Sequence, residues 1–281
     1  MKRRKFIQKA ALSTAGLSVL AGAGSSVYAA GANDYKYGII LSSLKNQVQE
    51  NPDETFRKLS EAGYTYIESI GRYGISAEHT MEYVRKYNFT PITTGDGMSQ
   101  LLNNTDHYLE IADKYDLPYI VCYYPWLDSA ENLTWEKCMK AAENLNKMAK
   151  ISRDAGRKFA WHNHHKEFVK LDDGTLAFDL LMENTDRAVN LELDIYWVKH
   201  AEHSILQTMK QYADRITILH LKDMRPGTAK QNTAPGKGII AFETILDKVP
   251  ETKTEFLVVE FAGDNLGVKD AVESIDYLKT L

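Results

Sequence analysis

Cysteine is scarce in this sequence, with only Cys122 and Cys138 among 281 residues. Cys122 lies in an apolar run and Cys138 in a helical pattern, so we expect both to be buried core thiols. A small fold held together by a network of disulfides is therefore excluded.

Basic charge is also in short supply. The chain has 34 Lys and Arg residues against 38 Asp and Glu residues. Five of these cations lie before residue 10, and without them 29 cations face 38 acids, a formal charge of −9. Nucleic-acid binding depends on the neutralisation of phosphates, so this balance argues against a nucleic-acid partner and against a DNA-repair nuclease.

The sequence lacks an apolar run long enough for a confident transmembrane span. Its first 30 residues instead combine a basic stretch, Lys2–Lys9, a mildly apolar stretch, Ala10–Gly24, and the cleavage-like signal Val27-Tyr28-Ala29. This pattern predicts a signal peptide over residues 1–30 and no stable membrane anchor after its removal. Arg3-Arg4 resembles the twin-arginine signal, with a general secretory signal as the alternative. We therefore expect a periplasmic or otherwise exported protein.

From residue 35 onward, short apolar runs alternate with amphipathic helical patterns. Eight runs predict buried strands: Tyr37–Leu41, Tyr66–Ile70, Pro91–Thr94, Tyr119–Tyr123, Lys158–Trp161, Asn190–Leu193, Ile216–Leu219 and Leu257–Val259. Eight segments predict helices: Pro52–Ala62, Ala77–Tyr87, Thr105–Tyr115, Thr134–Ala155, Leu176–Asn184, Ser204–Tyr212, Phe242–Lys248 and Lys269–Leu278. Strict alternation of this kind predicts a parallel sheet with right-handed crossovers.

Eight strand–helix units in about 245 residues have the size of a (β/α)8 barrel. An open doubly wound sheet is the alternative, but no Gly-rich phosphate loop follows the first strand. We therefore predict a single (β/α)8 TIM barrel over residues 31–281. The longer segment Met224–Gly238 is expected to be an irregular loop that either folds over a ligand or forms a surface excursion.

Four predicted strands end in side chains that bind metals: His162, Asp194, His220 and Glu260. Strands of a parallel sheet are apolar nearly throughout, so these polar ends need a reason. In a barrel the carboxyl ends of the strands meet at one face, where the chemistry of such barrels takes place. We therefore predict one divalent metal ion, Mn, Co, Zn or Mg, at the carboxyl face.

Five further residues are candidate substrate contacts: Glu68, Trp126, Asn163, Trp197 and Lys222. Glu68 lies in the second predicted strand and either binds substrate or pairs with a neighbouring cation. Lys222 follows His220 by two residues and shares its face if the strand continues. The two tryptophans offer ring faces that suit the C–H surfaces of sugars, with packing in the core or rim as the alternative.

The flanks of these strand ends carry a family resemblance. Leu193–Trp197 contains the Asp of a sixth strand, His220-Leu221-Lys222-Asp223 forms a His-x-Lys-Asp signature, and Pro235–Gly238 follows as a Gly-x-Gly turn. Val259-Glu260 then ends the eighth strand. In this order they resemble the xylose-isomerase-like barrel superfamily, sugar isomerases and epimerases with one divalent metal at the barrel mouth. The resemblance covers roughly the whole mature chain.

The fifth strand departs from the epimerases of that superfamily. There it ends in a glutamate that binds metal and moves protons together with the glutamate of strand 8. Here the position holds His162, in a segment that resembles a His-Asn-His-x-x-Glu-Phe subgroup. His164 shares a strand face with His162, and Glu167 is far enough along to reach back from a loop. Any of these three residues is a candidate for the fifth-strand ligand.

The resemblance implies an enzyme that removes a proton next to a carbonyl, with Glu260, Glu167 and His164 as the candidate proton-transfer groups. Without glutamates on both strands, one-sided chemistry is favoured over epimerisation. We therefore expect a lyase or hydratase acting on a keto-sugar or keto-glycoside, with an isomerase or epimerase as the alternative. A non-catalytic, metal-containing sugar-binding protein is the alternative from another class. The expected partner is a small sugar, and the chain is a possible homo-oligomer.

Overall fold

The computed structural model describes residues 35–263 and 265–281, so the predicted signal peptide lies outside the described residues. In the described part, nine strands form one sheet in the order β3-β2-β1-β11-β8-β7-β6-β5-β4, with every neighbouring pair parallel. The strands are β1 (Tyr37–Ile40), β2 (Tyr66–Glu68), β3 (Thr90–Pro91), β4 (Thr93–Gly97), β5 (Tyr119–Tyr124), β6 (Lys158–His162), β7 (Val189–Asp194), β8 (Ile216–Leu221) and β11 (Phe256–Val259).

The two ends of this sheet are adjacent in the chain, which closes the barrel. Strand β3 pairs with β2, β4 pairs with β5, and only Ile92 separates them. Ile92 N–H donates to the carbonyl of Ile67 (2.9 Å), and its carbonyl accepts from Tyr119 N–H (3.2 Å). The predicted third strand is therefore divided between β3 and β4, and the eight predicted strands form a nearly closed parallel barrel, as predicted.

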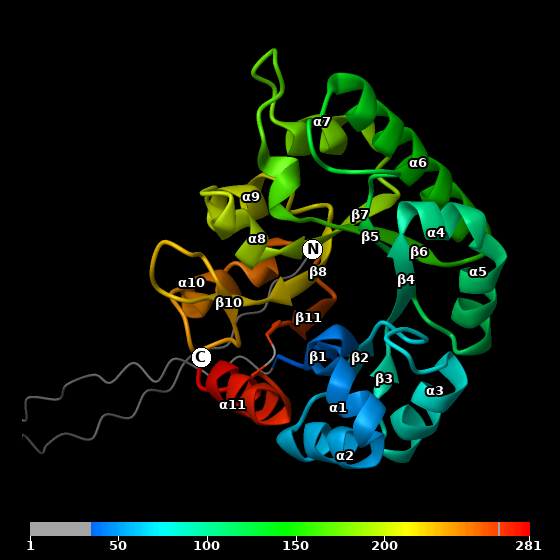
Figure 1. Cartoon of the computed structure of the whole chain (residues 1–281), viewed down its shortest axis with the longest axis vertical. Coiled ribbons are helices and arrows are strands. Elements are labelled where there is room, and N and C mark those ends of the chain that lie inside the picture. The colour runs from blue at the N-terminus through cyan, green and yellow to red at the C-terminus, as the bar shows by residue number, and fades with distance from the viewer. Residues whose placement is uncertain (1–34, 264) are drawn as a thin grey trace, which may run out of the picture. The chain divides into compact units, whose positions relative to one another are not determined.

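The helices surround this barrel (Figure 1). The eight predicted helices are present with ends shifted by at most two residues: α2 (Pro52–Ala62), α3 (Ala77–Lys86), α5 (Thr105–Lys114), α6 (Trp135–Asp154), α7 (Ala177–Asn184), α9 (Ile205–Gln211), α10 (Phe242–Leu246) and α11 (Val268–Leu278). In α2, the side chain of Asn51 accepts from Glu54 N–H and Gly63 ends the helix at φ 94°. A side-chain cap at the start and a left-handed glycine at the end are common boundaries of helices.

Three short α-helices were not predicted: α1 (Lys45–Glu50), α4 (Met98–Asn103) and α8 (Ile195–His200). Three 3-10 turns accompany them: η1 (Leu41–Leu44), η2 (His165–Phe168) and η3 (Val249–Glu251). Each of these segments is six residues or shorter, too short to show a helical period in the sequence. The strict strand–helix alternation is therefore interrupted by short helices and turns, which follow strands at the barrel mouth except for η3, which precedes β11.

The segment Met224–Gly238 is mostly irregular, as expected, but it includes one short pair of strands. It contains an antiparallel hairpin of β9 (Asp223–Met224) and β10 (Asn232–Thr233). The carboxylate of Asp223 accepts from four backbone N–H groups, those of Met224, Gly236, Gly238 and Ile240, at 2.7 to 3.1 Å. Any Cβ at position 238 would lie 2.2 Å from the carbonyl oxygen of Met224, so the hairpin base needs glycine there.

A small apolar cluster supports the residues of the strand ends. It includes Ala160, Ile218 and Val258, each two residues before a predicted metal ligand. Side chains two apart on a strand share a face, so His162, His220 and Glu260 point to the same side as this cluster. A larger cluster packs the helices against the sheet and includes the buried thiols of Cys122 and Cys138, as predicted. Among the described residues, no helix is long and apolar enough to cross a membrane.

Candidate metal centre and active site

Four predicted ligands converge at the carboxyl ends of the barrel strands. His162, Asp194, His220 and Glu260 each offer a ligand atom, and these atoms all lie within 4.8 Å of one another. His162 ends β6, Asp194 ends β7, His220 lies near the end of β8, and Glu260 follows β11. In the parallel register Asp194 pairs with His220 and Val258 with His220, which brings the three strand ends to one level.

The ring of His162 presents one nitrogen to the cluster and the other to a carboxylate. Its Nδ1 lies 3.0 Å from Glu192 Oε1, and its Nε2 lies 3.9 Å from Asp194 Oδ2. Burial, followed by the nearby His220, holds the pKa of His162 well below its usual value, so the ring is neutral. A neutral ring that donates from Nδ1 to Glu192 keeps the Nε2 lone pair available for a metal.

His220 is held in the same way with the two nitrogens exchanged. Its Nδ1 lies 2.7 Å from Glu260 Oε2, while its Nε2 lies 3.1 Å from Glu68 Oε2 and 3.2 Å from Glu192 Oε1. Burial alone would lower the pKa of His220, but the carboxylates of Glu192 and Glu68 outweigh it and raise this pKa well above its usual value. The raised pKa means that both ring nitrogens of His220 carry a proton. Binding of a cation to Nδ1 would require loss of the Nδ1 proton, whereas Nε2 could keep its hydrogen bonds to Glu68 and Glu192.

Asp194 has one oxygen committed to the fold and one that is not. Its Oδ1 accepts from the backbone N–H of Tyr196 (2.8 Å) and Trp197 (3.3 Å), which caps α8. Its Oδ2 is buried and has no hydrogen-bond partner among the described residues, and the same holds for Glu192 Oε2. Burial is the largest cause that raises the pKa of Asp194 to about 7.

This donor set fits a divalent cation. Buried carboxylate oxygens without partners are costly unless a proton or a cation compensates them. Glu68, Glu192 and Asp194 are fully buried beside Glu260, and Lys222 is the lysine paired with this group. Two imidazole nitrogens and two carboxylate oxygens form the mixed ligand set of many Zn, Mn and Co sites.

Lys222 and Glu260 form the part of the site nearest the mouth. Lys222 Nζ lies 2.7 Å from Glu260 Oε1 and 3.7 Å from Asp194 Oδ2. Burial alone would raise the pKa of Glu260, but Lys222 and His220 hold it well below its usual value. The side chain of Glu260 is 13% exposed, whereas those of Asp194 and His220 are fully buried. Glu260 is therefore the candidate ligand that a molecule entering from the mouth meets first.

Glu167 does not reach back to the cluster. Its Oε1 accepts from Trp126 Nε1 (2.9 Å) and its Oε2 accepts from the backbone N–H of His164 (2.7 Å). Burial raises the pKa of Glu167 to about 7. The 3-10 turn η2 directs this carboxylate into the protein, so Glu167 and Trp126 contact each other and the backbone of His164 and lie apart from the four-residue cluster. His164 itself lies close to the site, with its ring 4.9 Å from that of His162.

Two other predicted substrate contacts also prove to be internal. Asn163 is fully buried, and its side chain accepts from Asp194 N–H (2.9 Å) and donates to the Asp194 carbonyl (3.3 Å). Glu68 is fully buried between His220 and Tyr123, whose hydroxyl donates to Glu68 Oε1 (2.9 Å). Asn163 thus joins the ends of β6 and β7, and Glu68 orients His220. Trp197 remains half-buried, with Lys222 Nζ 5.0 Å from its ring centroid.

Sequence reasoning missed Glu192 and Tyr123. A signal for Glu192 was present, because it precedes Asp194 by two residues on the same strand and must share its face. Tyr123 carried no such signal, since a tyrosine in an apolar strand is ordinary. Its hydroxyl lies 2.7 Å from Ser69 Oγ as well as 2.9 Å from Glu68, so it links the ends of β2 and β5.

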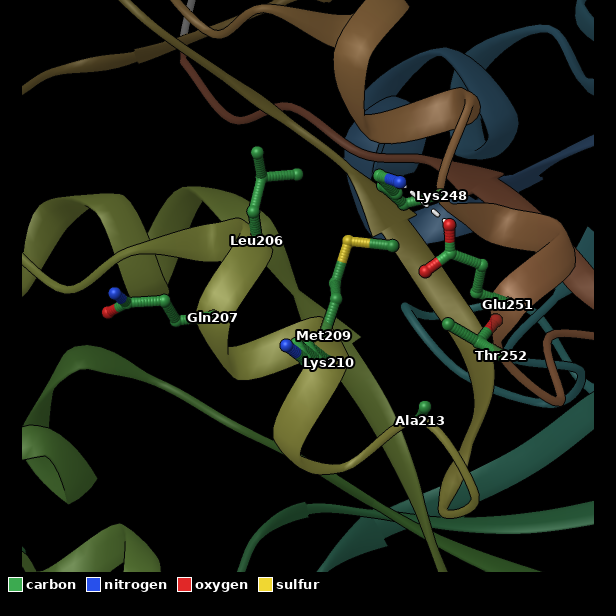
Figure 2. A pocket seen from close by; sticks show the side chains of 8 residues that line it. All are labelled: Leu206, Gln207, Met209, Lys210, Ala213, Lys248, Glu251 and Thr252. Atoms are coloured by element: carbon green, nitrogen blue, oxygen red, sulfur yellow. Dashed lines mark hydrogen bonds and ion pairs between the residues drawn. The ribbon is translucent and has the colours of Figure 1, made fainter.

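A separate hollow of about 410 Å³ lies between α9 and the segment 248–252 (Figure 2). Figure 2 shows Leu206 and Met209 on one side and the ion pair of Lys248 and Glu251 on the other, with 2.7 Å between the charged atoms. No predicted site residue lines it. Because it adjoins the segments that precede β8 and β11, it lies toward the amino ends of the strands, away from the candidate chemistry.

Part of the chain is similar in sequence to curated proteins. An inosose dehydratase of Clostridium perfringens is 28% identical over 158 residues, which are 50% of this chain and 52% of the relative. An inosose dehydratase of Clostridium beijerinckii is 29% identical over 141 residues, 44% of this chain and 46% of the relative. The chain spans about half the length of the curated relatives it matches.

Solved structures share the fold over nearly the whole described barrel. A sugar phosphate isomerase/epimerase from Parabacteroides distasonis has a TM-score of 0.72 and 22% identity, covering 93% of this chain and 98% of that chain. The IolI protein with a zinc atom has a TM-score of 0.64 and 17% identity, covering 87% and 96%. A 3-keto-D-glucoside 4-epimerase from E. coli has a TM-score of 0.65 and 16% identity, covering 88% and 99%.

A family model for the xylose isomerase-like TIM barrel matches residues 56–281. That range includes all but the first strand of the observed barrel and all four converging ligands. The nearly closed barrel, the candidate ligands at its carboxyl face and this match agree with one another: the chain belongs to the xylose isomerase-like TIM barrel family.

Proposed function

We propose that this protein is a divalent-metal-dependent lyase that acts on a keto-sugar or keto-glycoside. The observation that carries this proposal is the convergence of His162, Asp194, His220 and Glu260 within 4.8 Å, with Lys222 beside them. A divalent cation bound by these four side chains would supply Lewis-acid polarisation of a substrate carbonyl. The protein's own groups supply proton transfer and charge stabilisation.

Glu260 is the proposed base. It is ionised and faces the mouth, but Lys222 and His220 make it a weak base in the ligand-free geometry. When the ammonium of Lys222 turns from Glu260 to the substrate's carbonyl oxygen, Glu260 loses a stabilising partner and becomes more basic. The same ammonium then stabilises the negative charge that develops on that oxygen as the neighbouring carbon loses its proton.

Elimination follows naturally from a single accessible carboxylate. The electron pair of the broken C–H bond forms a carbon–carbon double bond and expels the oxygen substituent on the next carbon. The proton held by Glu260 passes to that departing oxygen, so the products are an enone and a free alcohol. Epimerisation needs a second acid on the opposite face, and Glu167 is turned away from the cluster, toward Trp126 and His164.

The relatives support this chemistry at low identity. The curated relatives are named inosose dehydratases, and a dehydratase eliminates water from its substrate. The IolI protein, which shares the fold, binds a zinc atom, and this supports a divalent metal as the cofactor. Export through the predicted signal peptide would favour free sugars or glycosides over phosphorylated sugars, because phosphorylated sugars are largely cytoplasmic.

Incubation of the metal-loaded protein in D2O with methyl 3-keto-β-D-glucopyranoside tests the proposal. A lyase releases methanol and leaves an enone. Deuterium exchange at one carbon without methanol release would instead identify an isomerase or epimerase. Binding without exchange or release would identify a non-catalytic sugar-binding protein.

Two isosteric variants provide the comparison. Glu260→Gln removes the proposed base and should lower the rate by at least about 100-fold, the usual size of a general-base effect. Glu251→Gln makes the same change at an exposed position of the remote hollow, and should leave the rate unchanged. A Glu260→Gln variant that retains full activity would contradict the proposed role.

A further inference from the structure

A second cleft, of about 590 Å³, lies beside the metal centre. Its lining comes from the start of η2, from α8, from the β9–β10 hairpin and from the segment after β11. These segments follow β6, β7, β8 and β11, the same strands that carry the four candidate ligands. The cleft therefore opens on the carboxyl face of the barrel, next to the candidate chemistry.

Aromatic rings form one part of this cleft. The rings of His165 and Trp197 stack with centroids 5.0 Å apart at 30°, and His200 lies 5.3 Å from Trp197 and 5.7 Å from Tyr196. Burial lowers the pKa of both His165 and His200, so these rings are uncharged at neutral pH. A continuous wall of neutral rings suits the apolar face of a flat or chair-shaped ring.

The rest of the lining is polar and is tied to that wall. Tyr196 Oη donates to the carbonyl of Lys230 (2.7 Å), and Lys230 Nζ donates to the carbonyl of His200 (2.8 Å). Ala262 N–H donates to Asn232 Oδ1 (2.7 Å), which joins the hairpin to the segment after β11. These bonds hold the cleft in shape before any ligand arrives, while the exposed side chain of Arg225 lines it as a hydrogen-bond donor.

Trp197 is the wall that the cleft shares with the metal centre. Its ring lies 5.0 Å from Lys222 Nζ and 5.3 Å from the ring of His164. Lys222 in turn lies 2.7 Å from Glu260, the proposed base. A substrate whose reacting ring sits over Lys222 and Glu260 therefore has room to extend past Trp197 into the cleft.

We propose that this cleft binds a second glycosyl ring, the leaving group of a keto-disaccharide. The inference rests on the proposed function and adds to it the class of substrate. A sugar ring presents C–H bonds on its faces and hydroxyl groups around its rim, which match the ring wall and the polar lining respectively. The enzyme would then prefer a glycoside with a sugar leaving group over one with a small alcohol.

The test compares 3-keto-cellobiose with methyl 3-keto-β-D-glucopyranoside. We expect kcat/KM to be about tenfold higher for the disaccharide, which corresponds to about 1.4 kcal/mol of added binding. His165→Ala and Arg225→Ala should each lower the disaccharide value about five- to tenfold and change the methyl glycoside value by less than about twofold. Lys210→Ala, in the remote hollow of Figure 2, is the control and should change neither.

Each outcome decides between the two claims. Equal kcat/KM for both substrates, or cleft variants that affect both equally, would overturn the second subsite and leave the lyase intact. A preference for 4-nitrophenyl 3-keto-β-D-glucopyranoside without one for 3-keto-cellobiose would overturn the glycosyl assignment. If no keto-sugar turns over, the lyase proposal is refuted, and binding of cellobiose, measured by quenching of tryptophan fluorescence, tests the second subsite by itself. Saturable quenching that both cleft variants weaken supports the subsite. Absence of quenching overturns it.

Discussion

Glu192→Gln offers a sharp test of how the metal centre is built. Glu192 Oε1 lies 3.0 Å from His162 Nδ1 and 3.2 Å from His220 Nε2, so one carboxylate oxygen orients both candidate imidazole ligands. Glutamine keeps the shape and an acceptor oxygen but removes the charge that makes the rings better donors to a metal. Loss of such a partner typically costs about 10- to 100-fold in metal affinity, or about 1.4 to 2.8 kcal/mol.

The same change should leave the metal-free fold almost unaffected. Burial, followed by repulsion from Glu68, raises the pKa of Glu192 well above its usual value, so the metal-free fold gains little stability from the charge of this carboxyl. We therefore expect Zn²⁺ and Mn²⁺ affinity, measured by chelator competition, to fall while the melting temperature of the metal-free protein stays within about 2 °C. Unchanged metal affinity would refute the role of Glu192 in orienting His162 and His220. A large drop in metal-free stability would instead assign Glu192 a structural role.

Three further predictions concern the pH dependence of metal affinity, the buried hydrogen bond between Trp126 and Glu167, and export. Metal affinity should fall as the pH decreases, because metal binding displaces a proton from His220. Below about pH 7 it should fall more steeply, because Asp194 is then protonated too and a second proton must leave. A constant slope of log affinity against pH, measured by calorimetry from pH 5.5 to 8.5, would contradict the pKa of about 7 for Asp194. Trp126→Phe removes the donor to the buried Glu167 and should cost about 1 to 3 kcal/mol of stability in thermal unfolding, whereas an unchanged melting temperature would show that this bond is dispensable. Replacing Arg3 and Arg4 with lysine should retain the protein in the cytoplasm of an expression host if the twin-arginine reading is right, and normal export would favour a general secretory signal.

The barrel could be predicted from sequence because its strands are continuous apolar runs with clear helix boundaries between them. The third strand was harder, because Pro91 has no N–H to donate and the pairing partner changes at Ile92 from β2 to β5. The helix α8 was hidden for another reason. Its N-cap is Asp194, a residue whose position at a strand end predicted a metal ligand, and the structure gives its two oxygens different roles.

The candidate site was predictable where strand alternation decides direction. His162, Asp194, His220 and Glu260 end regular strands, so the barrel alone brings them together. Glu167 and Asn163 lie beyond the end of β6, where no period fixes the side-chain direction, and both prove to support neighbouring residues. Glu192, in contrast, lies within a regular strand two residues before Asp194, so the period-2 alternation of side chains could have predicted that it shares the face of Asp194.

The metal content of the purified protein tests the central claim most directly. Elemental analysis of wild-type protein should find about one equivalent of a divalent transition metal or magnesium per chain, because two imidazoles and two carboxylates form one site. His220→Ala removes one ligand and should lose that metal, while His79→Ala, an exposed histidine of α3, should keep it. Wild-type protein that binds no divalent metal and gains no activity from added cations would contradict the account.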